Sequence, residues 1–478
     1  MEESEAAPSP RWAAVLNRKP ETITFPPDTS DDVVYIDECL AFLLDTYGPA
    51  SSPTGVKGYA LDNEPALWFY THPRLFTQPL TVFELLTRSI DLSHTVKDLD
   101  PAAETFGPCL YGFTAYLNLQ DAPDWDEYSG TYNRFVEAYL DLMRAASDTA
   151  GVRLLDVLDV HWYPEPDGVY AGDTSRAVAE IRLQVTRSLW DSTYVEPSWI
   201  GQWFSPVAIL PYLQGAIDAY YPGTKLAITE YDYGAPHHIS GGLAQADALG
   251  IFGRYGVYFG SKWGPHSAYI RSAYRLYLDC DGNGTAFGNQ AVSASTSDIE
   301  NCPVYAARSG NGALHIVLIN RSYDEPITGH VSIIGDMDLA RGGSWGFSRS
   351  DTLLQPGAAI DIGPDHTFDV GLPPLSAHHL ILRPETGAAG EPVGEDVSLV
   401  TIEPNPARGV IHVRYRDGVD AAGYVAIHDV TGKLVREVYN RRGARSLTIE
   451  RLGLESGTYF LRIRAGDRAT TRKVLWTR

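Results

Sequence analysis

The sequence predicts an α/β protein: a (β/α)8 TIM barrel that lacks about its first three strands, an antiparallel β-sandwich, and a small C-terminal β-sandwich. Between residues 56 and 264, short apolar runs alternate with longer segments of helical periodicity, which is typical of parallel strands joined by crossover helices. From about 268 to 384, apolar and polar residues alternate between turn residues, as expected for antiparallel strands. Residues 398–478 show this second pattern again.

The parallel part contains five predicted strands, listed here in chain order: 56–64, 104–112, 154–165, 225–234 and 256–264. The segment 131–147, with apolar residues three and four apart, predicts one of the intervening helices. A complete barrel takes about 250 residues, and the chain before residue 56 shows little strand character. Residues 1–30 are rich in proline, and 31–47 predicts a helix capped by Asp31 or Ser30. We therefore expect a partial barrel over residues 1–267.

The all-β part begins with a predicted helix at 268–278, after which short strands build a sandwich over 268–384 that packs on the barrel. Residues 385–397 have the glycine, proline and glutamate content of a linker. Residues 398–478 hold enough short strands for a separate small sandwich.

Charge separates the C-terminal segment from the rest of the chain. The net charge is −22 over 478 residues, yet residues 397–478 hold 15 Lys and Arg against 8 Asp and Glu, and the remainder holds 23 against 52. Such an acidic body argues against binding to nucleic acid. No apolar run reaches the roughly 20 residues that cross a bilayer, so we expect no transmembrane segment.

Two glutamates at predicted strand ends are the main candidates for chemistry. Glu64 ends GYALDNE, and Glu230 follows KLAIT. Because a parallel barrel gathers the carboxyl ends of its strands on one face, both carboxylates can reach one cleft. A carboxylate pair is the minimum for cleaving a glycosidic bond, with Glu64 as acid and base and Glu230 as nucleophile. The alternative for either residue is a surface or helix-capping glutamate.

Several polar and aromatic residues near these strand ends are candidate substrate contacts. The string LDVHWYPE ends a third strand, where the histidine could bond a sugar hydroxyl or hold a carboxylate, and SWIGQWF lies in a predicted active-site loop. Flat aromatic faces stack on sugar rings, although burial in the core is the alternative for each of them. The candidates are Asn63, Tyr111, His161, Trp162, Tyr163, Trp199, Trp203, Tyr231 and Trp263.

No metal or other cofactor is predicted. His161 lacks the HxxH or HExxH spacing of a zinc site, and the acidic DCDGNG string lacks the remaining ligands of a calcium loop. The four cysteines match no metal spacing either. Cys280 and Cys302 lie close enough for a local disulfide in an exported protein, with two isolated buried thiols as the alternative.

Four extended strings resemble glycoside hydrolase family 44, and they occur in the order of that family: GYALDNEPALW, FGPCLYGFTAYLNLQDAPDW, LLDVLDVHWYPE and ITEYDYG. The resemblance implies a barrel with an attached β-sandwich, a retaining mechanism, and endo-action on β-1,4-glucans and xyloglucan. It places the acid and base at Glu64, the nucleophile at Glu230, and aromatic subsites at Trp199, Trp203 and Trp263. Members of the family begin with about three strands that this chain does not show.

The C-terminal segment resembles the sorting domain of the type IX secretion system. The resemblance rests on the strings EPNPARGVIHV, VAIHDVTGKLV and LESGTYFLRIRAG. It implies contact with the type IX machinery and a secreted or surface-attached protein. The acidic start MEESEAAPSP is not a signal peptide, so we expect the signal to have been lost together with the front of the barrel.

The sequence therefore predicts a secreted, monomeric retaining glycoside hydrolase whose partner is a β-glucan polysaccharide. Two alternatives remain open. One is a non-catalytic glycan-binding surface protein on a hydrolase fold, and the other is a related xylanase or mannanase.

Overall fold

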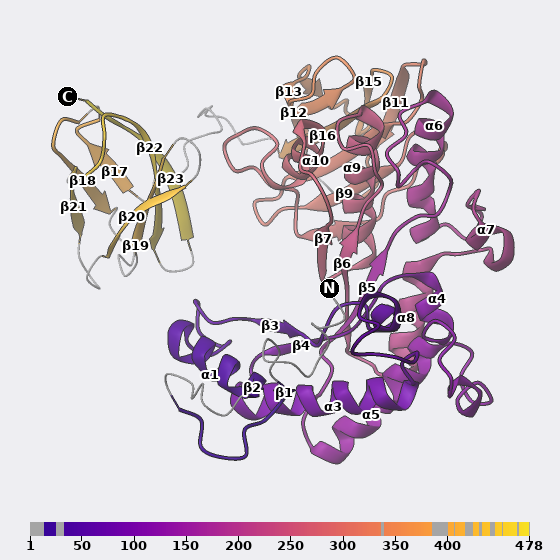
Figure 1. The fold of residues 1–478 in the computed structure, drawn as a ribbon. Helices are drawn as coiled ribbons and strands as arrows, with labels where there is room; N and C mark the ends of the chain where they lie inside the picture. The colour runs from indigo at the N-terminus through magenta and orange to yellow at the C-terminus, as the bar shows by residue number, and fades with distance from the viewer. Residues whose placement is uncertain are drawn as a thin grey trace. The chain divides into compact units, whose positions relative to one another are not determined.

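The computed structural model describes residues 14–24, 33–335, 339–384, 400–405, 407–415, 424–429, 433–439, 445–451, 453–465 and 468–477. The chain folds as two compact units, Met1–Glu385 and Thr386–Arg478 (Figure 1). The predicted linker at 385–397 lies outside the described residues. No helix in the described ranges is long and apolar enough to cross a membrane.

A five-stranded parallel sheet is the centre of the first unit. Its strands follow chain order: β3 (Gly58–Ala60), β4 (Glu104–Leu110), β5 (Val157–Trp162), β6 (Lys225–Tyr231) and β7 (Phe259–Lys262). All four neighbouring pairs are parallel, so the predicted barrel-type arrangement of five strands is confirmed.

Helices connect these strands, and Figure 1 shows α1, α3 and α5 side by side. α5 corresponds to the predicted helix at 131–147 but begins four residues later. The α-helices of this unit are α1 (Ile36–Tyr47), α2 (Trp68–Thr71), α3 (Val82–Leu99), α4 (Phe113–Asn118), α5 (Phe135–Ala150), α6 (Arg176–Val185), α7 (Trp199–Phe204), α8 (Ile209–Tyr220), α9 (Ile239–Tyr255) and α10 (Ala268–Leu278). Short 3₁₀ helices add η2 (Pro65–Leu67), η3 (Trp125–Glu127) and η4 (Thr186–Leu189).

The segment before the sheet differs from the prediction. A short strand, β1 (Ala14–Leu16), pairs in parallel with β2 (Val33–Tyr35), although residues 1–30 carry no strand periodicity. α1 begins at Ile36, with Tyr35 as its N-cap in an extended conformation, whereas the predicted caps Ser30 and Asp31 lie outside the described residues. The apolar run VVY is too short to show whether its periodicity is that of a helix or a strand. In the structure it forms strand β2 instead of the first turn of the predicted helix.

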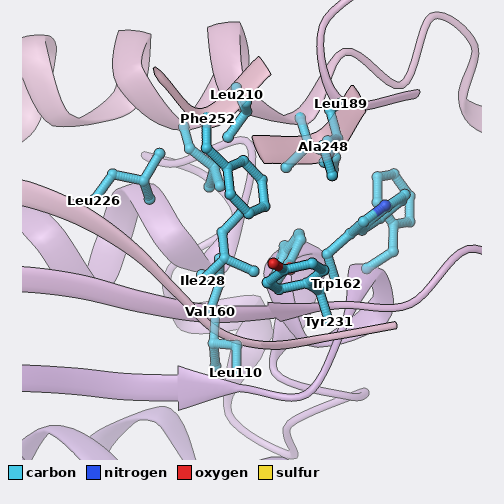
Figure 2. Packing of buried hydrophobic residues seen from close by; sticks show 14 of the residues in the cluster. Leu110, Val160, Trp162, Leu189, Leu210, Leu226, Ile228, Tyr231, Ala248 and Phe252 are labelled. Carbon is cyan, nitrogen blue, oxygen red and sulfur yellow. The ribbon is translucent and has the colours of Figure 1, made fainter. Parts of the chain in front are cut away.

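Apolar side chains between the sheet and its helices form the main core. Leu110, Val160, Trp162, Ile228 and Tyr231 leave the strands on the same side and pack against residues of η4, α8 and α9 (Figure 2). Trp162 is 1% exposed and Tyr231 is 0% exposed. This core fixes the outer face of the sheet, so the opposite side chains of the same strand ends are free to form a site.

The β-sandwich part of the first unit packs on α9 and α10. A seven-stranded sheet has the order β13-β12-β16-β10-β9-β8, with β14 beside β12, and β11 pairs with β15 in a second, two-stranded sheet. The predicted helix at 268–278 is α10. The strands are β8 (Gln290–Val292), β9 (Val304–Arg308), β10 (Leu314–Asn320), β11 (Ile327–Ser332), β12 (Leu339–Ser348), β13 (Gln355–Pro356), β14 (Ile360–Asp361), β15 (Thr367–Leu372) and β16 (Ser376–Pro384).

A buried ion pair joins this sandwich to the barrel helices. Arg321, which follows β10, pairs with Asp247 of α9, and both side chains are nearly inaccessible to solvent. Tyr305 of β9 donates a second hydrogen bond to Asp247 over 2.7 Å. Because an unpaired buried charge is costly, these contacts fix the sandwich against α9.

All four cysteines are free thiols, so Cys280 and Cys302 form no disulfide here; both are buried. Buried free cysteines behave as small apolar side chains, which explains the positions of Cys280 and Cys302 without a disulfide.

The second unit consists of two antiparallel sheets around one apolar core, as predicted for a small sandwich. The sheets have the orders β17-β18-β21 and β20-β19-β22-β23, and their core includes Ile411, Val425, Leu461 and Trp476. The strands are β17 (Val400–Glu403), β18 (Val410–Tyr415), β19 (Tyr424–His428), β20 (Leu434–Tyr439), β21 (Ser446–Glu450), β22 (Gly457–Ala465) and β23 (Arg468–Trp476).

A buried histidine pair predicts an acid-sensitive sandwich. His379 Nδ1 donates to the Leu276 carbonyl over 2.6 Å, and its Nε2 lies 2.9 Å from His315 Nδ1. Burial, and secondarily His315, lowers the pKa of His379 from 6.5 to about 3. As the pH falls, His379 is therefore protonated in the unfolded chain before it is protonated in the folded chain. The free energy of unfolding decreases as the pH drops from 6.5 towards 3, by at most about 1.4 kcal/mol per pH unit.

We expect His379→Asn to make that decline shallower, because Asn can still donate to the Leu276 carbonyl and does not titrate. Urea unfolding between pH 7 and pH 4 measures the slope. His330→Asn, at an exposed histidine, is the control and should keep the wild-type slope. Parallel slopes for the wild type and His379→Asn would contradict the prediction.

Candidate active site

The carboxyl ends of β3 to β6 hold the two predicted glutamates. Glu64 follows β3 and immediately precedes η2, where Pro65 begins the 3₁₀ turn. Its backbone is in the left-handed region, at φ 47°, and its N–H donates to the Cys109 carbonyl of β4 over 3.0 Å. The Trp68 indole donates to the Asn63 carbonyl over 3.1 Å. These contacts fix the turn, so the Glu64 side chain starts from a defined backbone.

His161 joins the two glutamates. Its Nδ1 lies 2.8 Å from Glu64 Oε1 and 3.5 Å from Glu230 Oε2. The histidine side chain is 1% exposed, whereas the glutamates are 24% and 20% exposed. Two carboxylates that are remote in sequence therefore converge at the edge of solvent, on an imidazole buried beneath them.

Tyr163 holds Glu230 from the other side. Its hydroxyl donates to Glu230 Oε2 over 2.8 Å. Burial first, and then the hydrogen bond and charge of Glu230, raise the pKa of Tyr163 well above its usual value of 10. The phenol therefore keeps its proton and remains a donor to the carboxylate at any ordinary pH.

A buried polar layer lies behind His161. Cys109 Sγ is 3.3 Å from His161 Nε2, the ring nitrogen that faces away from the glutamates. Thr229 lies 3.9 Å from the same sulfur and donates to Asp159 Oδ1 over 2.5 Å. Burial raises the pKa of Asp159 to about 6, against the hydrogen bond from Thr229. Burial, with the charge of Asp159, raises the pKa of the Cys109 thiol well above its usual value of 9.

Two breaks in strand register place these residues. Between β4 and β5, Pro108 pairs with Asp159 and Leu110 with Val160, which leaves Cys109 as an extra residue. Between β5 and β6, Val160 pairs with Ile228 and His161 with Glu230, which leaves Thr229 as an extra residue. Such bulges redirect side chains at the rims of sheets. Here they turn Cys109, Thr229 and Glu230 towards His161.

Three predicted tryptophans have exposed indoles. Trp199 is 40% exposed, Trp203 is 72% exposed and Trp263 is 56% exposed. Trp199 and Trp203 lie on α7, and the Trp199 indole is 3.4 Å from Glu165 Oε2. Trp263 follows β7, and its backbone N–H donates to the Tyr231 carbonyl over 3.0 Å. All three have an aromatic surface available to a ligand.

The hydroxyl of Tyr111 contacts Thr114 and Gln120. Burial raises the pKa of Tyr111, the hydrogen bond with Thr114 opposes this, and the charges of Glu165, Tyr70 and Glu64 add smaller increases. Glu165 and Tyr70 are not among the candidate residues predicted from the sequence. Glu165 stands in the string LDVHWYPE, at the position after the strand-ending tyrosine and proline, so its place in the motif was the available signal.

Trp162 and Tyr231 require a correction, because both were predicted to contact substrate. They belong to the apolar core and point towards the helices (Figure 2). Successive residues of a strand face opposite sides, so Trp162 points away from the side occupied by His161 and Tyr163. Tyr231 points away for the same reason, because it directly follows Glu230.

Cys109 is a site residue that sequence reasoning missed. In the sequence, Cys109 shows only that it fits no metal-binding spacing. The bulge that turns its thiol towards His161 arises from pairing between β4 and β5, for which the string GPCLY carries no local pattern.

Glu64, His161 and Glu230 each offer an atom that could coordinate a metal ion, and these atoms lie within 4.8 Å of one another. Among the residues that the structure describes, this is the group of acidic, histidine and cysteine side chains with metal-binding spacing. The hydrogen bonds within the group and from Tyr163 account for the arrangement without an ion.

Comparison with known proteins agrees with this geometry. Residues 2–166 match the model of glycoside hydrolase family 44, and residues 401–477 match that of a secretion system C-terminal sorting domain. Over 407 residues the chain is 48% identical to Endoglucanase A of Paenibacillus lautus, and this match covers 83% of the chain and 58% of that protein. The chain thus spans less than two thirds of that relative.

Solved structures extend the similarity across most of the chain. A family 44 xyloglucanase from Paenibacillus polymyxa is 46% identical, with a TM-score of 0.78, and the match covers 80% of this chain and 77% of that one. A family 44 endoglucanase from Clostridium thermocellum is 48% identical, with a TM-score of 0.77, over 79% of this chain and 76% of that one. Because sequence and fold agree over more than three quarters of these proteins, the chain belongs to glycoside hydrolase family 44.

Proposed function

We propose that this protein is a retaining, endo-acting glycoside hydrolase that cleaves β-1,4-glucans, including xyloglucan, by double displacement. Glu64 acts as the acid and base, and Glu230 acts as the nucleophile. The names of the relatives, an endoglucanase and a xyloglucanase, support the substrate class. The site geometry supports the reaction.

The spacing of the two carboxylates carries the proposal. One oxygen of Glu64 and one of Glu230 lie within 4.8 Å of each other. Retaining enzymes keep their carboxyl groups about 5–5.5 Å apart, whereas inverting enzymes need about 6.5–9.5 Å to admit a water molecule between carboxylate and sugar. Carboxylate oxygens that approach each other this closely leave little room for a water molecule between carboxylate and sugar, which favours direct attack by Glu230.

Glu230 is arranged to attack through one defined oxygen. Tyr163 donates to Oε2, and His161 Nδ1 approaches the same atom. Oε1 is therefore the oxygen left for the anomeric carbon. In the first step, Glu230 Oε1 bonds to this carbon while Glu64 gives its proton to the departing glycosidic oxygen.

In the second step, Glu64 takes a proton from water, and the water oxygen displaces Glu230 from the same carbon. His161 lies against Oε1 of Glu64, so Oε2 is the oxygen that exchanges the proton. The two displacements restore both side chains and leave the configuration of the sugar unchanged.

We propose that Trp199, Trp203 and Trp263 stack on sugar rings of the polysaccharide, with Asn63, Tyr111 and Tyr163 beside the reacting sugar. Exposed indoles at the carboxyl side of the sheet support these roles. Lys262, paired with Asp232 over 2.9 Å, donates to the Trp263 carbonyl over 2.7 Å and so fixes the backbone of that residue.

We also propose that the second unit directs export to the cell surface or beyond through the type IX secretion machinery. The match of residues 401–477 to a secretion system C-terminal sorting domain supports this destination. Polysaccharide is too large to enter a cell intact, which agrees with an enzyme that works outside.

Substitution of the two glutamates tests the reaction. We expect Glu230→Ala to lower reducing-sugar release from xyloglucan and carboxymethylcellulose by at least about a thousandfold. Glu64→Ala should retain hydrolysis of an aryl β-cellobioside whose leaving group needs no proton, and azide should then yield a β-glycosyl azide. Anomeric proton NMR of fresh wild-type product should show the β configuration.

Other outcomes of the same assays would contradict the proposal. Equal release by wild type and Glu230→Ala would remove the nucleophile assignment, and an α product would exclude retention. Preference for xylan or mannan would change the substrate class. Tight polysaccharide binding without release of reducing sugar would identify a glycan-binding protein instead.

Tyr163→Phe tests how Glu230 is held. Loss of a hydrogen bond to a charged group costs about 1.5–3 kcal/mol, so we expect kcat to fall by about ten- to a hundredfold while KM changes little. Steady-state kinetics on xyloglucan measures both constants. A fall in kcat/KM caused by KM alone would mean that Tyr163 binds sugar without orienting the carboxylate.

Trp203→Ala tests a stacking subsite. An aromatic contact contributes about 0.5–1.5 kcal/mol, so we expect KM for xyloglucan to rise by about three- to tenfold with kcat largely kept. Tyr258→Ala is a matched control, because Tyr258 is 48% exposed and precedes β7 at the opposite end of the sheet. Equal changes in the two variants would contradict a subsite at Trp203.

A further inference from the structure

The thiol of Cys109 has no part in the reaction as described, yet it contacts the group that joins the two glutamates. The residue is 4% exposed and sits on the β4 bulge with φ 61°, a backbone conformation that cysteine seldom adopts. Its carbonyl accepts from the Glu64 N–H, and its sulfur lies against His161 Nε2. Cys109 thus touches both the backbone of Glu64 and the partner of the Glu64 side chain.

The neighbours of His161 determine where its proton belongs. Nδ1 has Glu64 Oε1 at 2.8 Å and Glu230 Oε2 at 3.5 Å. A carboxylate is an acceptor, so a hydrogen on Nδ1 satisfies this side. In the neutral ring, Nε2 then carries a lone pair and needs a donor. The group facing it is the Cys109 sulfur, at 3.3 Å.

The other neighbours of the sulfur are acceptors too. Asn63 Oδ1 lies at 3.7 Å, and Thr229 Oγ1 lies at 3.9 Å. Thr229 gives its one hydroxyl proton to Asp159 Oδ1 over 2.5 Å, so it presents a lone pair to the sulfur. Burial and the charge of Asp159 oppose loss of the thiol proton. The Asp159 carboxylate is a further acceptor for the thiol proton. His161 Nε2, at 3.3 Å, lies closer to the sulfur than Asn63 and Thr229 do, and this short contact favours donation to His161.

We propose that Cys109 is a positioning residue whose S–H donates to His161 Nε2 and thereby keeps His161 as the neutral Nδ1–H tautomer that donates to Glu64. The effect on catalysis rests on the proposed role of Glu64. With Oε1 bonded to Nδ1–H, the mobile proton of Glu64 sits on Oε2.

The same contact keeps positive charge out of the site. A proton on Nε2 would create an imidazolium between two carboxylates, which would favour the ionised form of Glu64 and remove its acidic proton. The ionisable groups around His161 are Glu64 and Glu230 at Nδ1, Cys109 at Nε2, Asp159 behind the thiol, and Tyr163 on Glu230. Among these, only the thiol faces the nitrogen that must stay unprotonated.

The tautomer can be measured directly. In full-length protein labelled with ¹⁵N-histidine, His161 is assigned by the signal missing from His161→Asn. We expect the wild type to show a protonated Nδ1 and an unprotonated Nε2 at pH 6 to 8, and Cys109→Ala to show protonation of Nε2 over part of this range. The spectrum needs no substrate, so its result stands even if the glucanase proposal fails.

Kinetics then tests the consequence. We expect Cys109→Ala to lower kcat on xyloglucan by about tenfold, the scale of one lost hydrogen bond, with KM unchanged and the acid side of the kcat/KM profile altered. Cys109→Ser keeps a hydroxyl donor and should recover most of the activity and the wild-type tautomer. Serine and alanine are both smaller than cysteine, so the difference between Cys109→Ser and Cys109→Ala separates donation from packing.

Cys302→Ala is the matched control, because Cys302 is also a buried thiol but lies in the sandwich. It should change neither the His161 spectrum nor the pH profile. A protonated Nε2 in the wild type would overturn the proposal. So would Cys109→Ala with the wild-type tautomer and kcat, or Cys109→Ser that behaves like Cys109→Ala.

Discussion

The two bulges in the parallel sheet are the constraint on which the rest of the site depends. A regular strand sends alternate residues to opposite sides, and Ile228 and Tyr231 both belong to the core although three positions separate them. The extra residue Thr229 makes this possible. It allows β6 to keep both apolar side chains on the helix side and to send Thr229 and Glu230 together towards His161. The bulge at Cys109 does the same for β4.

The core and the site are therefore two faces of the same strand ends. Trp162 is packed among helix residues on one side, while His161 and Tyr163, its neighbours in sequence, contact the glutamates on the other. Close packing of the outer face holds the strands in one register. Because the register also sets which residues face His161, the apolar core positions the carboxylates as surely as their own hydrogen bonds do.

Polar contacts become more buried from the solvent edge of the site inwards. The glutamate side chains are partly exposed, His161 is not, and Asp159 behind it is fully buried. Each layer offers a donor or acceptor to the next, so the exposed carboxylates are held by side chains that water cannot reach. Such support is needed where reacting atoms must stay in place. Backbone strain at Glu64 and Cys109, both at positive φ, occurs at this same point.

Apolar periodicity and strand-stop residues are local properties of the chain, so the five parallel strands, the later antiparallel strands and the positions of Glu64, His161 and Glu230 at strand ends were all predictable from the sequence. Which neighbours of those residues face the site depends instead on how the strands pair. Trp162 and Tyr231 are aromatic residues at strand ends, as a sugar contact requires, but their side chains lie on the helix side of the sheet. The sequence around Cys109 has no distinguishing local pattern. The reason is physical: side-chain direction at a bulge is set by pairing with strands about 50 to 70 residues away, so no local string can encode it.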